Sequence, residues 1–303
     1  MRKEGKTGAG DEKPGCLDLH CHSRYSDGSL SVSELIKQAR EAGLSGLAIT
    51  DHDWLGQLSK VRALAQKEAF PVLAGVEVSA FDPAAGRKVH VLGYGLQATS
   101  DDSGPLERLV APTRNARTAN TLWQAWTLRH KGVTFEGAVP SLDDVADAAS
   151  ESGSVFKQHL MWTLTHLPYT DESYQEFYLK HFKNGGIACR DITYPDALDA
   201  VHAIREQGGV AVLAHPGQTD SWGLVPDLVH AGLQGIEAYH PDHTPDDVAR
   251  ATDAANSLGL FLTGGSDYHG IYGRPPQLGC SCISEDEAGQ DVADLFFAEE
   301  HLS

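Results

Sequence analysis

The chain has 303 residues, of which 41% are hydrophobic and 22% are charged. That length can bury a sizeable core, either in one large α/β domain with an insertion or in two modest domains. The net charge of −18 argues against a protein that binds duplex nucleic acid or an anionic membrane, since either would need a basic face. A small phosphorylated substrate remains compatible, because bound divalent metals can reverse the local potential.

The start of the chain and its cysteines indicate the cellular compartment of the protein. Residues 1–14 are charged and glycine-rich, which predicts a disordered leader rather than a secretory signal. No apolar run approaches the ~18 residues of a membrane span. The five cysteines are odd in number and include no C-x-x-C pair, so we expect reduced thiols and no disulfide framework. These features predict a cytoplasmic protein without membrane contact.

Seven short, β-rich apolar runs follow along the chain, and helical patterns separate most of them. The runs cover residues 16–20, 46–50, 71–76, 88–94, 209–214, 235–239 and 260–263. The first helix is expected to start with the capping box Ser31-Val-Ser-Glu34 and to stop at Gly43. Further helices are expected over 57–69, from Pro195 onward, and over 226–231 and 245–258. Strands alternating with helices indicate an α/β fold with a parallel sheet.

Residues 99–190 have no convincing strand and predict an all-helical insertion between strands 4 and 5. Helices are expected over 106–130, 141–150, 155–167 and 171–182, where aromatic residues give them apolar faces. The predicted organisation is therefore a leader (1–14), an α/β domain (15–98 and 191–303) and a helical cap (99–190) that folds against the mouth of the core.

Side chains that can bind metals stand at the C-terminal end of every predicted strand. They are Asp18, His20, His22 and Asp27, then Asp51, His52 and Asp53, then Glu77, His90, His215, His240, Asp267 and His269. On a strand, residues two apart share a face, so His20 and His22 can share one ion while Cys21 points away. A single histidine is more often a hydrogen-bonded core or loop residue, but seven strand ends carrying such groups favour a metal site. Imidazole with carboxylate suits zinc, iron or manganese.

Seven ordered motifs carry a resemblance to a known family. They are D-L-H-C-H-S-x-Y-S-D-G, T-D-H-D, G-V-E-V-S, H-V-L-G-Y, V-L-A-H-P-G, I-E-x-Y-H-P-x-H-T-P and G-G-S-D-Y-H-G, between residues 16 and 270. The chain resembles the polymerase and histidinol phosphatase (PHP) domain family, especially its stand-alone nucleotide phosphoesterases. The resemblance implies a distorted, TIM-like (β/α)7 barrel and a centre of three divalent ions, with Mn, Fe, Zn or Mg as candidates.

Nine ligand positions of that family match this chain. They are His20, His22, Asp27, His52, Glu77, His90, His215, Asp267 and His269. The resemblance implies that Glu77 bridges two ions, and we predict that Glu77, Asp267, His215 and His269 also take part in catalysis. A hydroxide bridging two ions would then attack phosphorus in line. Asp51 and Asp53, beside a ligand, are candidates for orienting an imidazole.

The substrate contacts depart from the resemblance. Nucleotide-specific relatives carry S-R-x-H-F-A-R at a helix start, where the arginine and histidine hold the substrate's phosphate, and here these positions are Gly153 and Val155. The candidates for substrate contacts are instead Lys157, His159, Arg190, His240, His243 and Arg274. The alternative for the first two is that they are solvated helix residues.

The predicted function is a metal-dependent phosphoesterase acting on a small phosphorylated nucleotide. The resemblance suggests release of the 3′-phosphate of 3′,5′-bisphosphonucleosides, or trimming of very short RNA. Alternatives are a histidinol-phosphate phosphatase and a metal-dependent deaminase or amidohydrolase. A non-enzymatic, metal-stabilised domain is disfavoured because none of the nine ligand positions is lost.

Overall fold

The structure, a computed structural model, describes residues 15–97, 104–274 and 277–299. Its strands are β1 (Cys16–Cys21), β2 (Gly46–Ile49), β3 (Val72–Ala74), β4 (Val76–Asp82), β5 (Arg87–Tyr94), β6 (Val210–Leu213), β7 (Gly235–Tyr239), β8 (Phe261–Gly264) and β9 (Ile283–Ser284). Its helices are α1 (Val32–Ala42), α2 (Leu58–Glu68), α3 (Pro105–His130), α4 (Leu142–Ala148), α5 (Lys157–Thr165), α6 (Glu172–Phe182), α7 (Ala197–Glu206), α8 (Pro216–Thr219), α9 (Val225–Ala231), α10 (Pro245–Leu258) and α11 (Glu285–Glu299). The predicted leader, 1–14, lies outside the described residues.

Backbone hydrogen bonds divide the described strands into two sheets, ordered β3-β2-β1-β9 and β4-β5-β6-β7-β8. The α/β class is confirmed, and each of the seven predicted runs contains a strand. The all-parallel arrangement is wrong, because β5 runs antiparallel to β4 and β6, and β9 antiparallel to β1. The hydrogen bonds among the described strands also do not close them into one barrel. Isolated bridges, Cys21 with Tyr268 and His52 with Glu77, connect the two sheets.

The sequence prediction contains neither β4 nor β9. Only Gly75 separates β3 from β4, and there the chain passes from one sheet to the other. A Cβ at Gly75 would lie 2.8 Å from the carbonyl oxygen of Gly93, so this close passage requires glycine. Two strands joined by one residue read in the sequence as a single run, which explains why β4 was not predicted.

The first helix forms as its capping residues predict. The hydroxyl of Ser31 accepts a hydrogen bond from the backbone N–H of Glu34, whose carboxylate accepts from the N–H of Ser31. The helix ends at Gly43, which takes the left-handed conformation at φ 75° that glycine adopts at little cost. Leu35, Ile36 and their neighbours on the same face are buried against the sheet.

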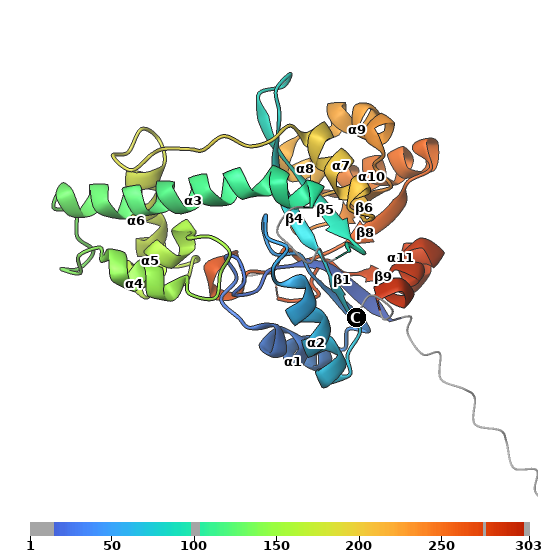
Figure 1. Ribbon diagram of the computed structural model, residues 1–303, viewed down its shortest axis with the longest axis horizontal. Helices are drawn as coiled ribbons and strands as arrows, with labels where there is room; N and C mark the ends of the chain where they lie inside the picture. Colours follow the sequence, from blue (N-terminus) through green and yellow to red (C-terminus); the bar gives the residue numbers. More distant parts are fainter. Residues whose placement is uncertain (1–14, 98–103, 275–276, 300–303) are drawn as a thin grey trace, which may run out of the picture.

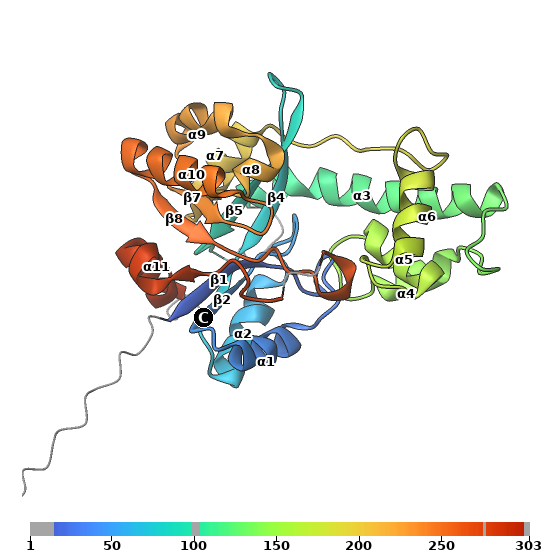
Figure 2. The same ribbon diagram turned by 180° about the vertical axis from the view of Figure 1, so that it is seen from behind.

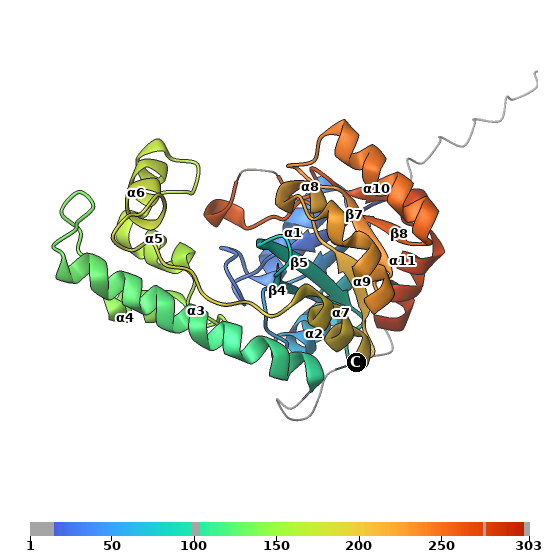
Figure 3. The ribbon, with the colours of Figure 1, turned by 90° about the horizontal axis from the view of Figure 1, so that it is seen from above.

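Helices α3–α6 form a lobe to one side of the two sheets (Figures 1, 2 and 3). The lobe has an apolar cluster of its own, which includes Leu128, Val145, Leu160 and Phe177. Each of the four predicted helices has a counterpart here, while the status of 99–190 as a separate domain stays a prediction. Although α3 has 26 residues, no described helix combines the length and apolar character needed to cross a membrane.

A disulfide joins Cys16 to Cys282, with Cα atoms 5.8 Å apart. This corrects the expectation that all five cysteines are reduced thiols. The antiparallel pairing of β1 with β9 places Cys16 opposite Ser284 and so brings residue 282 beside β1. With only two residues, β9 gives too short a sequence pattern to predict this pairing. Cys21, Cys189 and Cys280 are free.

A buried ion pair attaches the end of α11 to the four-stranded sheet. The carboxylate of Glu299 accepts a 2.7 Å hydrogen bond from Arg62 Nε and a 3.1 Å bond from the N–H of Ala74 in β3. Arg62 also donates to the carbonyl oxygen of Leu96 at 2.7 Å. Both charged side chains are buried, so loss of either would leave an unpaired charge away from water.

We therefore expect Glu299→Gln to lower the free energy of unfolding by about 3 kcal/mol, as measured by urea denaturation. Lys37→Gln is the matched control, because it breaks an exposed pair in which Lys37 Nζ lies 3.9 Å from Glu41 Oε1. The control should change stability by less than about 0.5 kcal/mol. Equal effects of the two variants would contradict the role given to the buried pair.

Candidate metal centre

Histidines and carboxylates from both sheets converge where the strand ends meet. Within the described residues, three groups each place one ligand atom per residue within 4.8 Å of one another. The groups are His22, Asp27, His52 and His269; His20, His22, Glu77 and Asp267; and Glu77, His90 and His215. Together they contain the nine residues predicted as ligands. The structure thus brings all nine together, and their binding of metal stays a prediction.

The carboxylate of Glu77 lies at the middle of this arrangement. Its Oε1 is 2.6 Å from His90 Nδ1 and 3.1 Å from His215 Nε2. Its Oε2 is 3.1 Å from His20 Nε2 and 3.0 Å from His22 Nε2. Because the two oxygens face different imidazoles, Glu77 has the geometry to serve two neighbouring ions.

Several of these atoms are buried without a hydrogen bond, which is the test of whether the residues suit a metal. The atoms include His20 Nε2, both ring nitrogens of His22, Asp27 Oδ1, His52 Nδ1 and Glu77 Oε2. Buried polar atoms without partners are costly, and a cluster of them calls for a ligand. Imidazole nitrogen and carboxylate oxygen form a donor set suited to divalent transition metals. The residues present therefore fit divalent cations.

The carboxylates of this cluster are ionised although burial opposes it. Burial would raise the pKa of Glu77, but the imidazoles of His52 and His20 hold it well below its usual value. Burial would likewise lower the pKa of His22, yet its contacts with Asp267 and Glu77 raise it to about 10. The cluster needs positive charge to balance its carboxylates, and metal ions can take the place of protons in that role.

Local backbone structure sets the direction of these side chains. His20 lies in β1 and His22 directly follows its last residue, Cys21, which donates from Sγ to the carbonyl oxygen of Ala48 at 3.0 Å. His215 and Asp267 follow β6 and β8 with positive φ values of 27° and 51°. Positive φ is uncommon for residues other than glycine, and it often occurs where a functional side chain must be aimed.

Glu237 in β7 is a site residue that the sequence analysis did not identify. Its Oε1 lies 3.1 Å from Nδ1 of His20, and its Oε2 accepts a 2.7 Å hydrogen bond from the backbone N–H of His215. It therefore fixes the ring of His20 so that Nε2 faces Glu77. A carboxylate behind a histidine is a common way to orient a metal ligand. The signal was available, because Glu237 lies in the strand before His240-Pro241, two residues from a strand end.

The carboxylates of Asp51 and Asp53, predicted to orient an imidazole, have other partners. Asp51 accepts hydrogen bonds from the N–H and Oγ of Ser23, at 2.8 and 2.7 Å. Asp53 accepts from the N–H of Ser79 at 2.8 Å and from Arg117 Nη2 at 2.6 Å. Asp51 and Asp53 therefore hold neighbouring segments of the chain in place, and neither accepts a hydrogen bond from an imidazole among the described residues.

Among the predicted substrate contacts, only Lys157 borders the cavity between the sheets and the lobe that Asp27 and His52 also line. His159 is buried, and its Nδ1 accepts from the N–H of Phe156 at 3.1 Å. Burial lowers the pKa of His159 to about 4, so its ring is neutral near pH 7. Arg190 lies outside that cavity, with its guanidinium 5.0 Å from the ring centroid of Trp123.

The other three candidates, His240, His243 and Arg274, do not line that cavity. His240 and Arg274 border a second cavity with Asp267 and His269. Arg274 also pairs with Asp242, at 2.8 Å from its Oδ1. His243 lines neither cavity; its Nδ1 donates to the carbonyl oxygen of Ala238 and its Nε2 accepts from the N–H of Gly217.

The sequence pattern of the PHP domain matches residues 18–184. A phosphoribosyl 1,2-cyclic phosphate 1,2-diphosphodiesterase of Eggerthella lenta is 45% identical, over 86% of this chain and 97% of its own. A 3′,5′-nucleoside bisphosphate phosphatase of Chromobacterium violaceum is 32% identical, over 84% of this chain and 87% of its own. An amidohydrolase structure from Chromobacterium violaceum, with bound sulfate and no metal, matches with a TM-score of 0.75 and 26% identity, over 93% of this chain and 96% of its own.

We expect Glu237→Gln to weaken divalent-metal affinity about 10- to 100-fold, because the charge that orients His20 is lost. The measurement is a competition titration with a chromophoric chelator. Glu287→Gln is the control, since that carboxylate accepts from the Tyr239 hydroxyl at 2.8 Å and is exposed. Unchanged affinity in Glu237→Gln would show that this residue does not position a ligand.

Proposed function

The chain belongs to the PHP domain family and is a phosphoester hydrolase, and we propose that it hydrolyses a cyclic phosphodiester on a phosphorylated ribose. The observation that carries the proposal is the continuous array of three ligand groups linked through His22 and Glu77. We propose that the nine residues of these groups hold three divalent ions. The choice of substrate follows the Eggerthella lenta relative, whose name describes a cyclic phosphate on a phosphoribosyl group.

Bound divalent ions would supply positive charge to the phosphate oxygens and lower the pKa of a water nucleophile. The chain's own residues set the geometry around the phosphate. Glu77, Asp267, His215 and His269 are proposed to border the reacting phosphoryl group. Glu237 keeps His20 and the backbone of His215 in place for this arrangement.

His240 is proposed to protonate the leaving oxygen. The backbone N–H of Asp242 donates to its Nδ1 at 3.1 Å, so the proton of the neutral ring resides on Nε2. That Nε2 is buried without a hydrogen bond and lies 3.6 Å from Asp267 Oδ2. A proton at this atom faces the centre, where an alkoxide would form.

The helix start that departs from the family pattern supports a substrate other than a nucleoside bisphosphate. A Cβ at Gly153 would lie 2.5 Å from Cγ of Trp54, so an arginine there would displace that indole. Trp54 is in turn held against the ring of Tyr25, with centroids 5.8 Å apart, and under Lys60 Nζ at 5.3 Å. The indole of Trp54 thus occupies the space that the phosphate-binding arginine of nucleotide-specific relatives would need.

A 3′,5′-nucleoside bisphosphate phosphatase is the second candidate function. The cavity beside the centre has a volume of about 290 Å³ and includes the rings of Tyr169, Tyr174 and Tyr178 in its lining. Aromatic rings of this kind can stack on a nucleobase. This observation and the Chromobacterium violaceum phosphatase relative are the reasons to include a nucleotide among the substrates that are assayed.

The proposal is tested by phosphate release and ester opening with a panel of substrates. The panel contains ribose 1,2-cyclic phosphate with a 5-phosphate, a 3′,5′-bisphosphonucleoside, histidinol phosphate and an amide substrate. We expect the cyclic ester to have the highest kcat/KM. Removal of divalent ions by chelation should abolish turnover, and Mn²⁺, Fe²⁺, Zn²⁺ or Mg²⁺ should restore it. Preferred turnover of the bisphosphonucleoside would favour the second candidate, and turnover of the amide alone would refute both.

We expect Glu77→Gln to reduce kcat at least about 10³-fold, because both groups that share this carboxylate lose a negative ligand. The fold should persist, since the amide keeps the shape of the side chain, and circular dichroism checks this. Near-normal turnover with intact structure would contradict a shared-ligand role for Glu77.

A further inference from the structure

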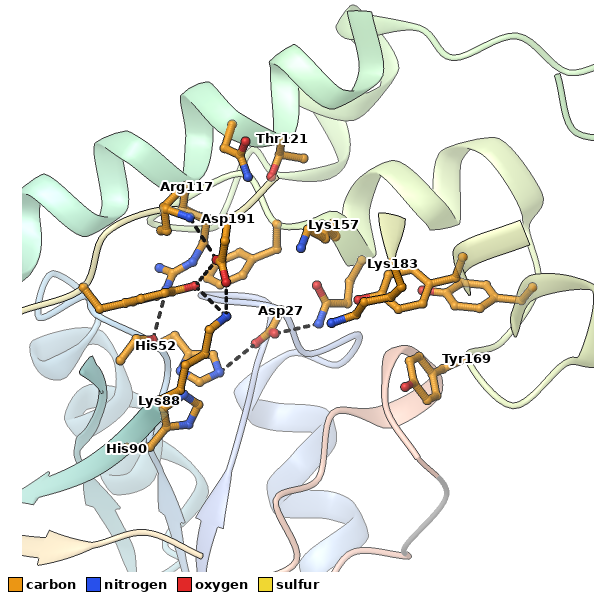
Figure 4. A pocket seen from close by; sticks show the side chains of 18 residues that line it. Asp27, His52, Lys88, His90, Arg117, Thr121, Lys157, Tyr169, Lys183 and Asp191 are labelled. Atoms are coloured by element: carbon orange, nitrogen blue, oxygen red, sulfur yellow. Dashed lines mark hydrogen bonds and ion pairs between the residues drawn. The ribbon is translucent and has the colours of Figure 1, made fainter. Parts of the chain in front are cut away.

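The cavity beside the metal centre has two walls of different origin. The sheet side contributes Asp27, His52 and His90, and the helical lobe contributes Lys157 on α5 and Lys183 just after α6. Figure 4 shows the two lysines on the lobe side, with Asp27 between them and the histidines. A molecule in this cavity would therefore touch the metal centre and the lobe at once.

Two of the four cations that line this cavity are already neutralised. Lys88 Nζ lies 2.7 Å from Asp191 Oδ2 and 3.2 Å from the Tyr194 hydroxyl. Arg117 Nη2 lies 2.6 Å from Asp53 Oδ2. Lys88 and Arg117 therefore pair with carboxylates of the protein itself, and their charge is not available for a ligand.

The other two cations, Lys157 and Lys183, form no salt bridge among the described residues, although Asp191 attracts Lys157 at longer range. Burial lowers the pKa of Lys157, and repulsion from Lys183 and Lys88 lowers it further. Lys183 has its Nζ 5.9 Å from the ring centroid of Tyr178, a contact that does not neutralise it. Two unpaired ammonium groups facing one cavity repel each other and are stabilised when an anion lies between them.

The surroundings of Lys157 also favour an anion. Phe156, Lys157 and Gln158, at the N-terminus of the nine-residue helix α5, all line the cavity. The positive end of a helix dipole and its first N–H groups attract negative charge. Gln158 Nε2 donates to Asp27 Oδ2 at 2.8 Å, which fixes this helix start directly against one of the candidate ligand groups.

We propose that Lys157 and Lys183 form a binding site for a second phosphate group of the substrate, separate from the phosphoryl group that reacts at the centre. The inference rests on the proposed function and adds to it, because it assigns named residues to a part of the substrate that is not hydrolysed. The ligand is a phosphomonoester dianion, since two lysines and a helix start match two negative charges. The tyrosine hydroxyls of the lining supply further hydrogen-bond donors.

The test compares two substrates that differ only in the second phosphate. Ribose 1,2-cyclic phosphate is assayed with and without a 5-phosphate, in the metal-loaded wild type and in Lys157→Gln, Lys183→Gln and the double variant. We expect each single substitution to lower the ratio of kcat/KM for the two substrates about 10-fold, and the double substitution about 100-fold. Lys180→Gln, which removes an exposed charge from α6, should leave the ratio unchanged.

Three results would overturn the proposal: a wild type that does not distinguish the two substrates, equal losses on both, or an equal effect of Lys180→Gln. Turnover of neither substrate would instead refute the proposed cyclic diesterase. In that case binding of ribose 5-methylenephosphonate, which resists hydrolysis, is measured by calorimetry. Affinity at least 10-fold weaker in the double variant than in Lys180→Gln would still support the second-phosphate site, and equal affinity would refute it.

Discussion

Glu77 stands at the start of β4, where the chain leaves the four-stranded sheet and enters the five-stranded one, and imidazoles from both sheets face its carboxylate. The position joins the sheets twice, because its backbone also forms an isolated bridge with His52. A buried carboxylate is tolerated only where opposite charge surrounds it. Glu77 thus takes part both in joining the two sheets and in balancing the charge of the centre.

Further buried carboxylates, behind the candidate ligands, hold the loops that carry these ligands in fixed positions. Asp18 accepts from the N–H and Oγ of Ser266, at 2.9 and 2.6 Å, and so holds the residue before Asp267. Asp51 binds Ser23 and, through Oδ1, Ser26, beside Asp27. Because Asp18 and Asp51 accept hydrogen bonds from backbone N–H and hydroxyl groups, they stabilise the conformation of these loops. The ligands themselves remain turned inward with unpaired atoms.

The parts of the molecule that depend on local pattern could be predicted from the sequence. Seven strand cores and the Ser31 cap follow from residues close to one another in the chain, and the convergence of His20, His22 and Asp267 follows from their places at the ends of predicted strands. The features that were missed depend on distant partners. The Cys16–Cys282 disulfide requires β9, and the role of Glu237 requires knowing that β7 passes behind His20. Lys157 could be proposed as a substrate contact, but Lys183 could not, because only the packing of α6 against α5 brings it to the same cavity.

The distribution of charge reconciles an acidic protein with an anionic substrate. With a net charge of −18, the surface as a whole repels a phosphate ester. At the cavity the balance differs, because Asp191 is neutralised by Lys88 while Lys157 and Lys183, which line the same cavity, form no salt bridge among the described residues. Bound divalent ions would reverse it on the sheet side. An anion is therefore attracted only at short range and only where both walls of the cavity can reach it. This favours a substrate whose two negative groups are spaced to meet both.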